Sequence, residues 1–67
     1  MIKLIIRTSN NMVLVFDDEG EQIPEYQGYY NGPLKNKIVQ DAPADAIFGH
    51  TINSRGETHL VRDREMW

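Results

Sequence analysis

The first part of the chain alternates between apolar and polar stretches in a way that is typical of β-strands. Residues 2–7 and 12–17 are rich in β-branched and aromatic residues, and the polar run 8–11 separates them. This order predicts an antiparallel hairpin. With a symmetric loop, one face would carry Leu4, Ile6, Val13 and Val15, and the other Ile5, Leu14 and Phe16. The second strand would then be apolar on both faces, as in a central strand that is covered on both sides.

A second turn is expected directly after this hairpin. Gly20 fits the left-handed position of a three-residue turn over residues 18–20. A third strand would follow at about residues 21–26. Because Pro24 has no backbone N–H to donate, we expect this strand to lie at an edge of the sheet.

The middle of the chain predicts one helix, over residues 33–41. Asn31 or Gly32 can cap its start, and Pro33 suits the first turn. Pro43 disfavours helical geometry at the residue before it, so the helix should end near Asp41. The apolar stripe that this helix would bury consists of Tyr30, Leu34 and Ile38.

Residues 46–52 and 57–62 predict a second hairpin across the turn segment 53–56, and Asp63 can cap a final helical turn. The element order is therefore ββ(β)αββ. It predicts a single α+β domain over residues 1–67, with a small antiparallel sheet of four to five strands, built from two hairpins, and one helix on one face.

Composition and charge exclude several classes of function. Of the 67 residues, 40% are hydrophobic and 25% charged, which suits a folded globular chain, and the net charge is −3. We expect no nucleic-acid partner, because such proteins carry a basic excess. No apolar run approaches the length of a membrane span, and no export signal is evident, so we expect a cytoplasmic protein without membrane contact.

The absence of cysteine excludes disulfides and thiolate metal sites. His50 and His59 are the only histidines. A two-residue turn in the second hairpin would place them directly opposite each other, whereas a three-residue turn ending at Gly56 would pair His59 with Thr51. Gly56 favours the second arrangement. Two imidazoles are too few for a usual zinc site, so we expect neither metal nor cofactor.

Catalytic chemistry has little support in the sequence. No glycine-rich phosphate loop is present, and no serine has a histidine or acid placed beside it by sequence. We therefore expect no catalytic residues and no enzyme activity. Three tyrosines, Tyr26, Tyr29 and Tyr30, offer a stacking platform for a small ligand, with Lys3 or Arg7 adding positive charge; the simpler interpretation is that their rings pack over the core.

The apolar second face of the first hairpin favours a protein contact. We expect the interaction residues to be Ile5, Leu14, Phe16, Met66 and Trp67. Trp67 either folds back to close the core, which we favour, or inserts into a partner. The leading hypothesis is a non-enzymatic protein-interaction module, acting by self-association as a homodimer or as a small adaptor or inhibitor of another protein. The alternative is a small-ligand-binding domain that uses the three tyrosines.

Two stretches carry a resemblance to other proteins. The run Pro24-Glu25-Tyr26-Gln27-Gly28, followed by residues 41–46 (Asp-Ala-Pro-Ala-Asp-Ala), resembles short bacterial or phage-borne proteins of uncharacterised function. It covers about a third of the chain. The resemblance implies no activity, cofactor or partner.

Overall fold

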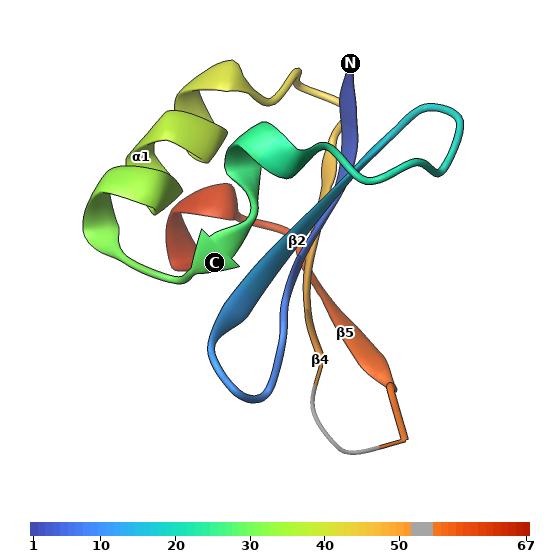
Figure 1. Ribbon diagram of the computed structural model, residues 1–67, viewed down its shortest axis with the longest axis vertical. Coiled ribbons are helices and arrows are strands. Elements are labelled where there is room, and N and C mark those ends of the chain that lie inside the picture. Colours follow the sequence, from blue (N-terminus) through green and yellow to red (C-terminus); the bar gives the residue numbers. More distant parts are fainter. Residues whose placement is uncertain (52–54) are drawn as a thin grey trace.

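The computed structural model describes residues 1–51 and 55–67, and these residues form one α+β unit. Its five-stranded sheet has the order β3-β2-β1-β4-β5. Figure 1 shows the described helical turns gathered on one side of that sheet. The predicted fold class is confirmed, but the sheet is mixed rather than antiparallel, because β1 and β4 run parallel to each other.

The first hairpin consists of β1 (Ile2–Arg7) and β2 (Met12–Asp17), with the bounds that the sequence predicts. Its register differs from the prediction by one residue, since Ile5 pairs with Val15 rather than with Leu14. The cause is the loop. Asn11 adopts a left-handed backbone with φ of 67°, and the Thr8 N–H donates to the Met12 oxygen at 2.7 Å. Asparagine tolerates this conformation, and the resulting three-residue loop shifts the cross-strand pairs of Leu4 to Arg7 by one residue.

This register decides which side chains enter the core. Ile5, Val13 and Val15 are fully buried on the side that faces the helix. An irregularity in the pairing between Ile2 and Leu4 brings Ile2 into the same cluster. The core is completed by residues from the helix, from β4 and from the end of the chain, namely Ile38, Ala42, Phe48 and Trp67. The prediction that grouped Val13 and Val15 with Leu4 and Ile6 is therefore wrong.

The predicted turn at residues 18–20 is confirmed, with Gly20 at φ of 81° and its N–H bonded to the Asp17 oxygen at 3.0 Å. The strand expected at residues 21–26 does not form. After one isolated bridge from Gln22 to Phe16, the chain enters a 3-10 turn, η1 (Pro24–Tyr26). The edge strand is instead β3 (Gly28–Tyr29), which pairs with the start of β2.

The predicted helix is confirmed as α1 (Gly32–Asp41). Asn31 is its N-cap, and the Asn31 side chain accepts a hydrogen bond from the Leu34 N–H at 2.8 Å. The predicted stripe faces the sheet: Ile38 is buried, while Leu34 and Tyr30 pack against the core. The helix ends at the residue before Ala42, in agreement with the restriction that Pro43 imposes.

The second hairpin pairs β4 (Ile47–Thr51) with β5 (Thr58–Val61). His50 lies directly opposite His59, so the favoured three-residue register is wrong. The predicted turn segment includes Asn53 and Ser54, which lie outside the described residues, as does Ile52 of the predicted strand. After α1, β4 pairs with the edge of β1 that β2 leaves free, and it runs parallel to β1.

The last residues form a 3-10 turn, η2 (Arg64–Met66), which Asp63 caps as predicted through a 3.0 Å bond from the Glu65 N–H. The turn directs Trp67 into the core, where the ring is 1% exposed. The Trp67 indole N–H donates to the Gly49 oxygen at 3.0 Å, and the ring makes edge contacts with Tyr30 and Phe48. The favoured alternative, in which Trp67 folds back, is confirmed.

Candidate functional site

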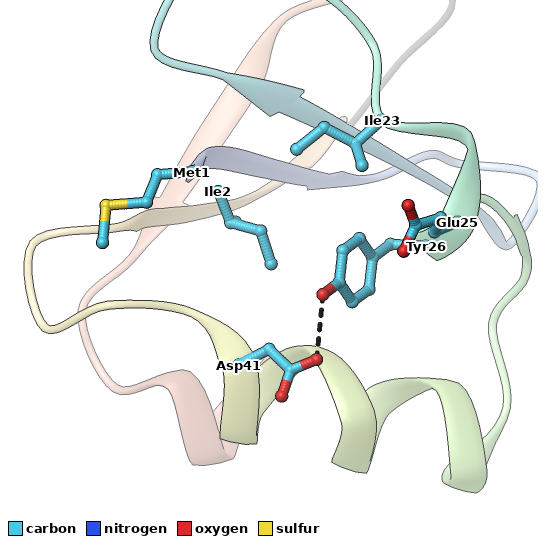
Figure 2. Close-up of a pocket in the computed structure, with 6 residues that line it drawn as sticks. All are labelled: Met1, Ile2, Ile23, Glu25, Tyr26 and Asp41. Atoms are coloured by element: carbon cyan, nitrogen blue, oxygen red, sulfur yellow. Dashed lines mark hydrogen bonds between the residues drawn. The ribbon is translucent and has the colours of Figure 1, made fainter.

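Two surface features can carry function: a cleft between η1 and the end of α1, and the sheet face that no described helix covers. The cleft has a volume of about 330 Å³ and is lined by Met1, Ile2, Ile23, Glu25, Tyr26 and Asp41. Figure 2 shows Ile2 and Ile23 beside the cleft and the Tyr26 ring reaching across to Asp41. Its walls are thus apolar, with an aromatic ring and two carboxylates.

The hydroxyl group of Tyr26 donates a hydrogen bond to Asp41 Oδ2 at 2.9 Å, which ties η1 to the end of α1. This bond raises the pKa of Tyr26, and burial and the negative charges of Asp41 and Glu25 act in the same direction. On the ring itself, Lys37 Nζ lies 5.1 Å from the Tyr26 centroid, a cation–π distance. The ring therefore lies in a negatively charged environment and already contacts one cation.

The second feature is a group of apolar side chains on the sheet face opposite α1, which we term the open face. It comprises Leu4, Ile6, Met12, Leu14, Phe16, Ile47 and Leu60, as the strand registers and side-chain alternation place them. Apart from Ile6, all are at least partly exposed, with Ile47 at 41% and Leu60 at 59%. None of them belongs to the core cluster or packs against it.

The predicted tyrosine platform is not assembled. Tyr29 is 75% exposed on the edge strand, and Tyr26 lines the cleft. Tyr30 instead packs against Trp67, with their ring centroids 5.4 Å apart. The three rings therefore lie in three different environments. Tyr26 and Tyr30 pack against the core, in agreement with the simpler interpretation that tyrosine rings cover it.

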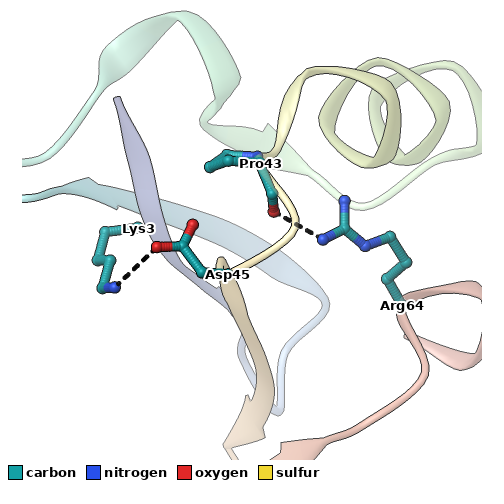
Figure 3. Close-up of polar contacts among 4 residues, drawn as sticks. All are labelled: Lys3, Pro43, Asp45 and Arg64. Carbon is teal, nitrogen blue, oxygen red and sulfur yellow. Dashed lines mark hydrogen bonds and ion pairs between the residues drawn. The ribbon is translucent and has the colours of Figure 1, made fainter.

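The two cations named with the tyrosines are also separated. Arg7 lies over the Tyr30 ring at 3.8 Å and donates to the Trp67 oxygen at 3.3 Å. Lys3 pairs with Asp45 instead, with 3.6 Å between Lys3 Nζ and Asp45 Oδ2 (Figure 3). Only Arg7 adjoins a tyrosine, and it does so in a packed contact rather than in a cleft.

The predicted interaction residues divide between the two sides of the sheet. Leu14 and Phe16 lie on the open face. Ile5 and Trp67 are 0% and 1% exposed in the core, so they are not available at the surface. Met66 is 75% exposed in η2, away from the open face.

The two histidines face each other across β4 and β5. His50 Nε2 lies 3.2 Å from the Trp67 oxygen, while His59 is exposed. Among residues 1–51 and 55–67, no group of three or more His, Asp and Glu side chains is close enough to hold a metal ion. Through its contact with Trp67, His50 lies beside the end of the chain that packs into the core.

Sequence reasoning did not select Glu25 or Asp41 as site residues. Asp41 does carry a signal that is readable from the sequence, because an acidic residue in the last helical turn lies at the negative end of the helix dipole. Glu25 carries no such signal. Its place at the cleft depends on η1, which forms where the sequence predicts a strand.

Comparison with protein-family models, with curated proteins and with solved structures found no match to this chain. Function therefore has to be argued from the open face and the cleft. In the described part of the chain, no helix has the length and apolar character needed to cross a membrane.

Proposed function

We propose that this domain is a non-enzymatic protein-interaction module that associates through the open face, with a second copy of the chain as its partner. The open face is the observation that supports this proposal. A sheet normally buries at least one face, and here the whole core cluster lies between the covered face and the elements packed on it. The opposite face carries seven apolar side chains, six of them at least partly exposed to solvent, and exposed apolar groups of this kind mark interaction surfaces.

The chemistry of the open face favours a second copy over a charged partner. None of its seven residues is charged, so two such faces can meet without opposing like charges. Two open faces related by a twofold axis would bury the same apolar surface on both chains, which is the commonest arrangement of small oligomers.

The size of the open face indicates a weak association. Four strands about 4.8 Å apart, each with about five residues at about 3.3 Å, span roughly 300 Å². Stable interfaces bury about 800 Å² on each partner. We therefore expect a dimer that forms reversibly and only at high concentration, and not an obligate one.

Sedimentation equilibrium over micromolar to millimolar concentrations tests the proposal. The wild type should rise from 7.7 kDa toward twice that mass as concentration increases. Leu60→Lys places a charge on the open face and should keep the chain monomeric. Met66→Lys makes the same change in charge at an exposed apolar residue away from that face, and should dimerise like the wild type.

Two results would contradict self-association. One is a wild type that stays at the mass of a single chain at every concentration. The other is equal loss of association in Leu60→Lys and Met66→Lys, which would show that the contact lies elsewhere.

A further inference from the structure

The cleft between η1 and α1 has a chemistry that the proposed association does not use. Its lining carries two carboxylate groups, those of Glu25 and Asp41. Asp41 lies in the last turn of α1, where the helix dipole adds to its negative field. The cleft is therefore net negative.

Neither carboxylate of the cleft is neutralised within the described residues. Lys3 forms an ion pair with Asp45, outside the cleft, and not with Glu25 or Asp41. The Asp41 carboxylate receives only the hydroxyl of Tyr26, a neutral donor. Lys37 and Arg64 approach this region, but Lys37 lies over the Tyr26 ring and Arg64 bonds to main-chain oxygens. Within residues 1–51 and 55–67, the two carboxylates of the cleft thus have no cationic partner for an entering cation to displace.

The apolar and aromatic residues of the cleft indicate which kind of cation it can bind. Met1, Ile2 and Ile23 provide apolar walls, and the Tyr26 ring closes one side (Figure 2). A bare metal ion is poorly served by apolar walls, and metal sites of this kind need more oxygen ligands than two carboxylates provide. The volume of about 330 Å³ lies at the lower end of the range for small-molecule sites. It suits a short aliphatic chain that ends in a positive charge.

We propose that this cleft binds a primary ammonium group on a short aliphatic chain, with Glu25 and Asp41 facing the charge and Ile2, Ile23 and the Tyr26 ring packing the chain. Such a group occurs in free alkylamines and in the lysine side chain of a partner protein. The contact is separate from the open face, so it stands or falls independently of self-association.

Amide ¹H–¹⁵N NMR titration tests this site with four probes. Butylammonium chloride should produce saturable shifts confined to residues 2–3, 23–27 and 38–42. Butan-1-ol and butyrate, which have similar chains but lack the positive charge, should bind more weakly. Lysine with blocked amino and carboxyl termini tests the protein source: binding at least as tight as that of butylammonium assigns the site to a partner's side chain, and weaker binding assigns it to a free amine.

Two matched variants isolate the charge. Glu25→Gln should weaken butylammonium binding by about two- to fivefold, the effect of losing one exposed ion pair. Glu65→Gln makes the same change in the equivalent turn, η2, away from the cleft, and should leave the affinity unchanged. The absence of saturable shifts in this region, equal binding of butan-1-ol, or equal weakening in the two variants would each overturn the proposal.

Discussion

Two glycines, Gly49 and Gly20, are required for different structural reasons. Gly49 lies in the middle of the sheet, and Trp67 bonds to its main-chain oxygen. A Cβ atom at Gly49 would lie 2.9 Å from Thr58 Cγ2 and 3.3 Å from the His59 oxygen. Position 49 therefore needs glycine because strand β5 leaves no room for a side chain. Gly20 is needed for another reason, since its turn requires a positive φ, which is 81° here.

Gly49→Ala should lower the free energy of unfolding by about 1–3 kcal/mol, as overpacking of a filled site does. Thr58→Ser removes the nearest atom, so the double variant Gly49→Ala/Thr58→Ser should recover part of the loss. Urea denaturation of the single and double variants measures both effects. If Gly49→Ala were as stable as the wild type, the close approach of β5 at this point would be wrong.

Tyr26 provides a prediction on pH at the same scale. Its raised pKa, caused first by the hydrogen bond to Asp41, favours the neutral hydroxyl in the folded state. The stability that this bond contributes is complete below about pH 10, the pKa of tyrosine in an unfolded chain. It is lost as the pH rises through the higher pKa of the folded protein.

Asp41→Asn should therefore move the Tyr26 titration to lower pH, because the variant removes the negative charge that opposes ionisation. ¹³C NMR of labelled tyrosine rings, with Tyr26→Phe to assign the resonance, follows this titration. The same Tyr26 titration curve in wild type and Asp41→Asn would rule out Asp41 as the cause.

At the scale of elements, the fold depends on how the short turn η2 joins α1 to the sheet. The Arg64 guanidinium donates to the oxygens of Val39, Ala42 and Pro43 at 3.3, 2.8 and 2.7 Å, and Figure 3 shows the last of these bonds. It thereby satisfies the oxygens of Val39 and Ala42 at the C-terminal end of α1, which have no partner within the helix, whereas the Pro43 oxygen also accepts from the Ala46 N–H at 3.0 Å. The Lys35 ammonium adds a bond to the Glu65 oxygen at 2.9 Å. These contacts hold Trp67 over the core.

Arg64→Ala should lower the free energy of unfolding by about 1–3 kcal/mol, since part-buried carbonyls lose their donor. Arg62→Ala removes the same charge two residues earlier, at an exposed position, and should change stability by less than about 0.5 kcal/mol. Thermal and urea denaturation compare the two. Equal losses would mean that net charge, and not the cap on α1, accounts for the effect.

At the scale of the whole molecule, the sheet has one covered and one open face, and neighbouring residues of β2 belong to different faces. Val15 is 0% exposed beneath α1, while Leu14 lies on the open face and is only partly buried. The sequence alone led us to expect cover on both sides of this strand. Because α1, η1 and η2 all lie on one side, the other remains available for a partner.

Val15→Asp should prevent folding, because a domain of this size has only about 3–10 kcal/mol of stability to oppose an unpaired buried carboxylate. Leu14→Asp should keep a cooperative unfolding transition, since water can reach the new charge. Circular dichroism during heating distinguishes the two variants. A Leu14→Asp chain that fails to fold, measured where the wild type is monomeric, would show that the open face is covered within the chain.

Local chemistry by itself determined the two hairpins, the helix with its Asn31 cap and Pro43 end, and the Gly20 turn. Each of these depends on contacts between residues a few positions apart, which the sequence displays directly. The sequence also pointed to Leu14 and Phe16, which lie on the open face, and to Tyr26, which lines the cleft.

Only the tertiary structure decided the parallel pairing of β1 with β4, the covered face, the burial of Ile5 and the cleft that joins Glu25 to Asp41. A strand apolar on both faces does not indicate where the helix will pack, and a shift of one residue at Asn11 exchanges the faces of every residue along it. The direction of β4 and the choice of the covered sheet face depend on residues that are far apart in the sequence and meet only in the folded chain.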